Sequence, residues 1–301
     1  MPNERVAVGV DAGGSSVHVS IDGEPADVTH SPANATTYGI ERVASTIGDA
    51  VERALKHRRA AAIVVGAAGT GRESVANALQ AALSMRFSQS NVRVVDDAKI
   101  ALRAVAGGGD GIVLIAGTGS IAYGEISGAR YRAGGYGYAF GDDGSGYAIG
   151  SAALRLLARS FEGRAPRDSM LDAIAAVLEA ASVQELVARV YASESPVRTV
   201  AEIAPVVIEF AGRSERSAAK IVQAAALELS DLVRTVWRLA AIGDREVPLG
   251  LSGGLLNAEN SLLSYLLETR LANELPHARI EKRFSAVDGA VAMARELMQA
   301  T

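Results

Sequence analysis

The stretch VLIAGTGSIAYGEISG, residues 113–128, decides the fold because the chain contains a second copy of its pattern. Residues 8–23 read VGVDAGGSSVHVSIDG and align with 113–128 without a gap, so that Gly14 coincides with Gly119. Each copy predicts a strand, a turn rich in glycine and hydroxyl side chains, a second strand and a hairpin turn. Two related half-domains explain this repeat, and the alternative is chance similarity between glycine-rich turns.

The rest of the chain favours duplication, because a second pair of segments repeats in the same order. Residues 62–83, AIVVGAAGTGRESVANALQAAL, and 247–271, VPLGLSGGLLNAENSLLSYLLETRL, both predict a strand, a glycine loop and a helix. Between the repeats, roughly residues 146–241 have helical periodicity, and we expect the last helix there to start after Ser214. This alternation of strands and helices predicts an α/β protein.

Composition excludes several classes of function. The chain has 301 residues and a formal charge of −4, so it carries no basic excess for nucleic acid. It has no cysteine, which excludes disulfides, thiolate nucleophiles and cysteine-held iron–sulfur clusters. The first residues lack the apolar run of a secretion signal, and the apolar stretch 112–124 is too short to span a bilayer. We therefore expect a cytoplasmic protein without a membrane partner.

The two glycine-hydroxyl loops are candidate phosphate-binding loops. Glycine lets the backbone approach a ligand closely, and concave arrays of N–H groups bind anions. Either loop alone is equally typical of a simple turn. Two such loops from two half-domains, facing each other across a cleft, would hold a polyphosphate from both sides. The sequence contains neither a Walker GxxxxGK[ST] motif nor a GxGxxG dinucleotide motif.

The segment after the second loop, residues 131–157, also indicates a ligand site. Its sequence is YRAGGYGYAFGDDGSGYAIGSAALRLL, with seven glycines from Gly134 to Gly150 interleaved with aromatic residues. The acid pair in GDDGS precedes a predicted helix, and Asp as a helix N-cap would explain it without any function. The density of glycine instead favours a backbone shaped for a ligand.

With these motifs, the chain resembles the N-acetylglucosamine kinase-like group of BadF/BadG/BcrA/BcrD-type ATPases, in the sugar kinase, Hsp70 and actin superfamily. The resemblance rests on DAGGSS, VVDDA, IAGTGS, AGGYGYAFGDDGSGY and LSGGLLNA in this order, and it covers nearly the whole chain. It implies a duplicated actin-like ATPase fold: two ribonuclease-H-like domains, an interdomain cleft and a helical insertion in the second domain. We expect the first domain at residues 1–108 plus 284–301 and the second at 109–283.

The resemblance also implies roles for individual residues. Asp97 matches the catalytic base, and Asp11 matches a residue near Mg²⁺. The positions implied for ATP are Asp11, Gly13, Gly14, Ser15, Ser16, Gly117, Thr118, Gly119, Ser120, Ser252, Gly253, Gly254 and Asn257. The positions implied for the sugar are Asn34, Asp97, Thr118, Gly134, Gly135, Tyr136 and Asp142.

The neighbouring acid Asp96 leaves the identity of the base open. Alignment on the following Ala98 selects Asp97, whereas Asp96 would point to the opposite side of a strand. Asp97 could also serve only as the N-cap of a helix that starts at Ala98. Milder departures from the family pattern are Ala12 and Ser15 in the first loop, and Tyr136 in place of tryptophan.

The resemblance thus implies an ATP-dependent amino-sugar kinase that transfers the γ-phosphate to a hydroxyl of a hexosamine. N-acetylglucosamine or glucosamine is the expected acceptor, with muramic-acid derivatives as a further choice. We expect ATP and Mg²⁺ as cofactors, a small-molecule sugar as substrate and a homodimer. The alternatives are a BadF-type ATPase without an iron–sulfur cluster and a non-catalytic sugar or nucleotide sensor.

Overall fold

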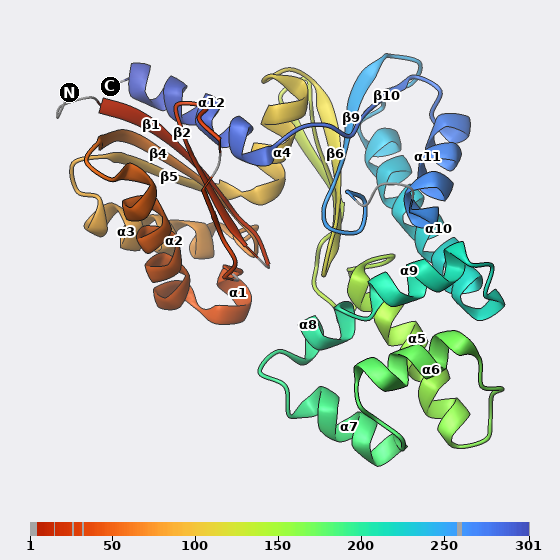
Figure 1. The fold of residues 1–301 in the computed structure, drawn as a ribbon. Coiled ribbons are helices and arrows are strands. Elements are labelled where there is room, and N and C mark those ends of the chain that lie inside the picture. Colours follow the sequence, from red (N-terminus) through yellow and green to blue (C-terminus); the bar gives the residue numbers. More distant parts are fainter. Residues whose placement is uncertain (1–4, 15, 26, 32, 258–260, 301) are drawn as a thin grey trace. The chain divides into compact units, whose positions relative to one another are not determined.

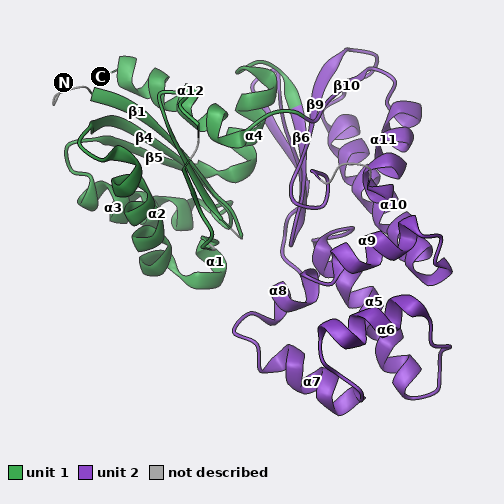
Figure 2. Ribbon diagram, viewed as in Figure 1, with its two compact units in different colours: residues 1–111, 283–301 green, residues 112–282 purple. Residues whose placement is uncertain are grey.

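The computed structural model describes residues 5–14, 16–25, 27–31, 33–257 and 261–300. The chain divides into two compact units, coloured separately in Figure 2. The first unit contains residues 1–111 together with 283–301, and the second contains residues 112–282. The last helix of the chain thus belongs to the same unit as the first strand.

The first unit is built on a mixed sheet whose strands have the order β3-β2-β1-β4-β5. Figure 1 labels β1, β2, β4 and β5 of this sheet. The first three are antiparallel neighbours, and β4 and β5 continue parallel to β1. The strands are β1 (Arg5–Ala12), β2 (Val17–Ile21), β3 (Asp27–Thr29), β4 (Arg59–Ala67) and β5 (Asn91–Asp96). The helices are α1 (Ala35–Tyr38), α2 (Ile40–Leu55), α3 (Glu73–Arg86), α4 (Asp97–Ala106) and α12 (Ala286–Gln299).

The two faces of β1 bury residues of different size because side chains alternate along a strand. Val6, Val8 and Val10 belong to the core that α2 and α3 share with the sheet. Ala7 belongs to a smaller core on the other face, with residues of α4 and α12. At Gly9 an added Cβ would lie 2.5 Å from the backbone nitrogen of Val291, so glycine lets α12 lie directly on the sheet.

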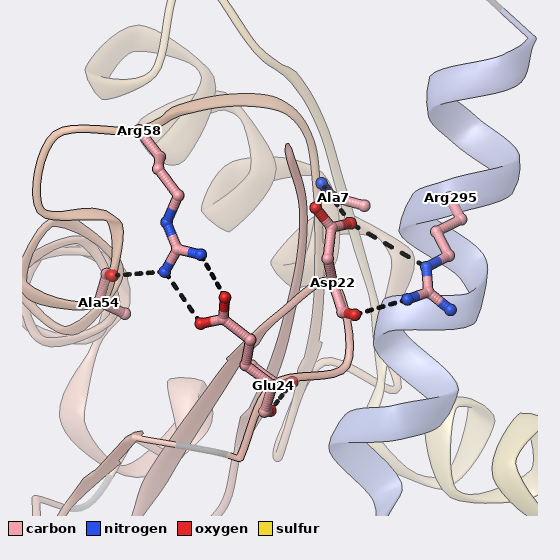
Figure 3. Close-up of polar contacts among 7 residues, drawn as sticks. Ala7, Asp22, Glu24, Ala54, Arg58 and Arg295 are labelled. Atoms are coloured by element: carbon pink, nitrogen blue, oxygen red, sulfur yellow. Dashed lines mark hydrogen bonds and ion pairs between the residues drawn. The ribbon is translucent and has the colours of Figure 1, made fainter. Parts of the chain in front are cut away.

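Polar contacts tie the turn after β2 to both sides of this unit (Figure 3). The N–H of Ala7 donates to Oδ1 of Asp22 at 3.1 Å. Arg295 of α12 donates to the carbonyl of Asp22 at 2.6 Å. Arg58 holds the carboxylate of Glu24 with two hydrogen bonds, of 2.6 and 3.1 Å. These contacts add to the apolar packing that joins α12 to the N-terminal strands.

The second unit has a sheet of strand order β10-β9-β6-β7-β8. Its strands are β6 (Gly111–Ala116), β7 (Ser120–Ile126), β8 (Ala129–Gly134), β9 (Val247–Ser252) and β10 (Ala278–Glu281). Its helices are α5 (Gly146–Phe161), α6 (Ser169–Val177), α7 (Val183–Tyr191), α8 (Pro196–Ala201), α9 (Ala204–Gly212), α10 (Arg216–Leu239) and α11 (Leu262–Glu274). Helices α5 to α10 follow one another between β8 and β9, where the sequence predicts the helical insertion.

The strand orders confirm the predicted duplication. Numbered along the chain within each unit, both sheets have the order third, second, first, fourth, fifth. The hairpin β1–β2 corresponds to β6–β7, and β4 followed by α3 corresponds to β9 followed by α11. The prediction for α10 is wrong in one detail: the helix starts at Arg216, and Ser214 has φ of 67°, which is not an N-cap conformation. Among the described residues, no helix has both the length and the apolar composition needed to cross a bilayer.

Candidate active site

The first glycine loop connects β1 and β2 and is closed by its own backbone. The N–H of Gly13 donates to the carbonyl of Ser16 at 2.9 Å, and the carbonyl of Gly13 accepts from Ala33 at 3.0 Å. At Gly14 an added Cβ would meet no atom within 4 Å, so the loop borders open space. Ser15, predicted to bind ATP, lies outside the described residues.

His18 is a neighbour of this loop that sequence analysis did not find. Its Nε2 lies 2.9 Å from Oγ of Ser16, and it stands opposite Asp11 in the antiparallel pair β1–β2. Burial raises the pKa of Asp11, and the nearby His18 opposes that rise. The sequence does contain a signal for this contact, because residues two apart on a strand point to the same face.

Asp96 and Asp97 occupy the junction between β5 and α4. Both carboxylates accept the N–H of Ala98, at 3.1 and 2.9 Å, but the N-cap of α4 is Asp96. Asp97 is the first residue of the helix, so the alternative that Asp97 is its N-cap is wrong. Burial raises the pKa of Asp97 well above its ordinary value of 3.8, and the negative charges of Asp96 and Asp11 raise it further. Three carboxyl groups of this unit therefore form one electrostatic cluster at the carboxyl ends of β1 and β5.

Asn34 lies beside the loop that follows β4. Its Oδ1 caps α1 by accepting the N–H groups of Thr36 and Thr37, at 3.0 and 3.1 Å. Gly69 has φ of 82°, and a Cβ there would lie 2.5 Å from Oδ1 of Asn34. The side-chain nitrogen of Asn34 has no hydrogen-bond partner among the residues that the structure describes. It is therefore a fixed donor that remains available to a ligand.

In the second unit, the loop Gly117–Ser120 connects β6 and β7 and is bonded to the start of α5. The N–H of Gly146 donates to the carbonyl of Gly117 at 2.8 Å, and that of Tyr147 donates to Thr118 at 3.1 Å. The predicted helix start after GDDGS is correct. Its N-cap is Ser145, whose Oγ accepts from Ala148 at 3.2 Å, and neither acid has this role.

Asp142 packs directly against this loop. A Cβ at Gly119 would lie 2.8 Å from Oδ2 of Asp142, so glycine lets the carboxyl group lie against the loop. Oδ1 of Asp142 lies 3.4 Å from the N–H of Ser120. Burial raises the pKa of Asp142, whereas the N–H groups of Ser120 and Gly137 lower it. The carboxyl group predicted to bind sugar is thus fixed beside the loop predicted to bind phosphate.

The third glycine segment of this unit follows β9 and lies against β6. Ser252 stands opposite Ile115 in the parallel pair of strands. Gly253 has φ of 101°, and the N–H of Leu255 donates to the carbonyl of Ala116 at 3.1 Å. The N–H of Asn257 donates to the carbonyl of Gly253 at 3.0 Å. The loops after β6 and β9 are therefore neighbours within one unit, as the proposed nucleotide site requires.

The structure also contains a cavity of about 540 Å³ that the sequence did not predict. Its two cationic residues, Arg216 and Lys220, lie one turn apart at the start of α10, and neither has an acidic partner among the described residues. Its apolar wall includes Leu262, the first residue of α11. The lining residues are Ala211, Gly212, Ser214, Arg216, Ala219, Lys220, Gln223 and Leu262.

The donor set is compatible with Mg²⁺ held jointly by protein and substrate. Among the described residues, no group of three or more His, Cys, Asp or Glu side chains is arranged to hold a metal by itself. Mg²⁺ usually takes one or two carboxylates together with phosphate oxygens and water. Asp11 in its crowded carboxyl cluster fits that pattern, because a divalent cation would relieve the repulsion among these groups.

Within each unit, the structure brings the predicted residues together. Asp11, the first loop, Asn34 and Asp97 belong to the first unit, and the remaining predicted residues belong to the second. That the two groups face each other across a shared cleft stays a prediction.

Comparison with known proteins finds relatives whose similarity covers almost the whole chain. An N-acetylmuramic acid/N-acetylglucosamine kinase of Clostridium acetobutylicum is 28% identical over 301 residues, covering 97% of this chain and 98% of the relative. An N-acetyl-D-glucosamine kinase of Dictyostelium discoideum is 26% identical over 299 residues, covering 92% and 93%.

Solved structures share the fold at lower identity. A provisionally named N-acetylglucosamine kinase from Chromobacterium violaceum has a TM-score of 0.76 at 24% identity, covering 96% of this chain and 99% of that one. A ROK family glucokinase from Streptomyces griseus, in complex with glucose and AMPPNP, has a TM-score of 0.59 at 20% identity, covering 98% and 100%. The two-unit α/β architecture predicted from the repeat is therefore a known fold. The sequence model of the BadF/BadG/BcrA/BcrD ATPase family matches residues 8–294, and the chain belongs to this family.

Proposed function

We propose that the protein is an ATP-dependent sugar kinase that phosphorylates a hydroxyl of a hexosamine, with N-acetylglucosamine as the expected acceptor. One observation carries the proposal: each of the two repeated units places a glycine-hydroxyl loop after its first strand, and one unit adds a half-buried cluster of carboxyl groups at the same end of its sheet. Phosphoryl transfer needs mainly positioned phosphates and neutralised charge, which such loops supply. The two kinase relatives support the acceptor class.

On the nucleotide side, Gly13–Ser16 and Gly117–Ser120 would bind the phosphates through backbone N–H groups and hydroxyls. Ser252, Gly253, Gly254 and Asn257 would border the adenosine. The cavity between α9, α10 and α11 is a suitable place for its base and ribose, because it combines apolar walls with the cations Arg216 and Lys220. Mg²⁺, when bound at Asp11, would neutralise phosphate charge.

On the sugar side, Asp97 would accept the proton of the attacking hydroxyl. Its raised pKa supports this role, because a general base works best when its pKa approaches the working pH. The side-chain nitrogen of Asn34 would donate to a sugar oxygen, and Asp142 would accept from a sugar hydroxyl. Thr118, Gly134, Gly135 and Tyr136 would complete the pocket.

A screen for sugar-dependent release of ADP tests this function. The acceptors are N-acetylglucosamine, glucosamine, N-acetylmannosamine, N-acetylmuramic acid and glucose, each with ATP and Mg²⁺. We expect the highest kcat/KM with N-acetylglucosamine. Release of ADP with none of them would contradict kinase activity and favour a sensor that binds without turnover. The homodimer stays a prediction, which light scattering after size exclusion measures.

A further inference from the structure

Arg132, near the end of β8, contacts three successive residues of the proposed sugar pocket. Its Nη2 donates to the carbonyl of Gly135 at 2.7 Å and to that of Gly134 at 3.2 Å. Its Cζ lies 4.9 Å from the ring centre of Tyr136, within the range of a cation–π interaction. No role follows for Arg132 from the sequence motifs or from the proposed chemistry.

The backbone that Arg132 holds is unusual. Gly134 and Gly135 are consecutive residues with φ of 70° and 71°, a conformation that side chains rarely adopt. A Cβ at Gly135 would lie 2.7 Å from Nη2 of Arg132, so the turn closes tightly around the guanidinium. The loop is completed by a hydrogen bond of 2.8 Å from the N–H of Gly135 to the carbonyl of Gly141.

The surroundings of Arg132 differ from those of Arg130, two residues earlier on β8. Arg130 is exposed and forms an ion pair of 3.3 Å with Glu125. Arg132 is half-buried and has no acidic partner among the described residues. Its guanidinium instead interacts with two backbone carbonyls and one aromatic ring. A lysine cannot reproduce this arrangement, because it lacks the planar guanidinium group, which donates hydrogen bonds within its plane and stacks its flat face on an aromatic ring.

We propose that Arg132 is a positioning residue of the acceptor-sugar site. It fixes the left-handed Gly134–Gly135 turn and holds the ring of Tyr136, which is 57% exposed and so presents apolar surface to a sugar ring. This inference rests on the proposed function, because it assigns the loop to the acceptor. It predicts that changes at Arg132 affect sugar binding and leave nucleotide binding alone.

The first test is steady-state kinetics of Arg132→Lys and Arg132→Met, with Arg130→Lys and Arg130→Met as matched controls. We expect the KM for the sugar to rise about tenfold to a hundredfold, the loss typical of hydrogen bonds from a charged group, with the KM for ATP within about twofold of wild type. In a double-mutant cycle, the effects of Arg132→Met and Tyr136→Leu on the KM for the sugar should be less than additive in free energy, because each substitution removes the same Arg132–Tyr136 contact. Equal rises in both KM values, or equal effects of the Arg130 variants, would overturn the proposal.

The second test is hydrogen exchange of residues 133–141 in the protein without ligands. The Arg132 variants should speed exchange in this loop, and the Arg130 variants should not. Unchanged exchange in Arg132→Lys, the milder variant, would overturn the inference whatever the activity. If wild-type protein phosphorylates no hexosamine, the proposed function fails, and the exchange data still decide whether Arg132 holds the loop.

Discussion

Replacing Gly253 with alanine tests the packing of the proposed nucleotide site. Gly253 follows β9 with φ of 101°, a region that an alanine occupies only under strain. Its added Cβ would lie 2.6 Å from the carbonyl carbon of Ala116 and 2.8 Å from its nitrogen, and closer still to its oxygen. Ala116 ends β6, whose neighbours in the sheet are β9 and β7, so its backbone has little freedom to move away.

The magnitude follows from two terms. Backbone strain of a non-glycine residue at positive φ costs about 1–3 kcal/mol. Forcing a methyl group into a packed site costs about 1–3 kcal/mol more. Gly253→Ala should therefore lower the free energy of unfolding of the second unit by about 2–6 kcal/mol. Gly254→Ala is the matched control, because a Cβ there meets nothing within 4 Å and the residue has no positive φ.

The assay is urea denaturation followed by the fluorescence of Trp237. This is the only tryptophan of the chain and is buried in the core of the second unit, so its emission reports that unit. Gly253→Ala should shift the midpoint to lower urea, and Gly254→Ala should stay within about 0.5 kcal/mol of wild type. A Gly253→Ala protein as stable as wild type would refute the close approach of this loop to β6.

Four further predictions concern the first unit. Asp97→Asn should lower turnover by about 10²–10⁴-fold, measured by ADP release, with Asp96→Asn as the control; near-normal turnover would eliminate Asp97 as the base. The kcat/KM of wild type should fall as pH falls through the raised pKa of Asp97. The free energy of unfolding of Asp97→Asn, relative to wild type, should increase as pH rises from about 3.8 through the raised pKa of Asp97, because the folded wild type holds the Asp97 proton more tightly than the unfolded chain does. Urea titrations at several pH values measure this difference. A difference that does not change with pH would contradict the prediction. Gly289→Ala should destabilise the protein by about 1–3 kcal/mol, because the added Cβ would lie 2.8 Å from the nitrogen of Ala104 and 3.0 Å from the carbonyl carbon of Ile100. Thermal unfolding followed by circular dichroism measures this change. A variant more stable than wild type would show that the higher helix propensity of alanine outweighs the clash.

The sequence predicted the fold well because duplication is visible in one dimension. Gly14 and Gly119 fall at equivalent turns, and the two sheets repeat one strand order. Helix ends were harder to predict. Ser145 rather than an acid caps α5, and α10 starts two residues after Ser214. Several polar residues near each terminus compete for these roles, and only the local backbone geometry decides among them.

Tertiary contacts account for the parts of the candidate site that sequence analysis missed. Arg132 looks like any polar residue of an alternating strand, and its role depends on the path of the glycines after it. His18 stands opposite Asp11 only because of the register of β1 and β2. Arg216 and Lys220 line a cavity only because α9, α10 and α11 pack together, and no sequence motif predicts that packing.

The position of α12 has a consequence for biosynthesis. This helix covers one face of the N-terminal sheet, yet the ribosome makes it only after all of the second unit has been translated. Until then, of the two helices α4 and α12 only α4 is present on that face, Gly9 lacks its neighbour Val291, and the nascent first unit remains open to non-native association. We expect a chain that ends before Ala286 to aggregate, because it lacks the helix that covers this face of the N-terminal sheet.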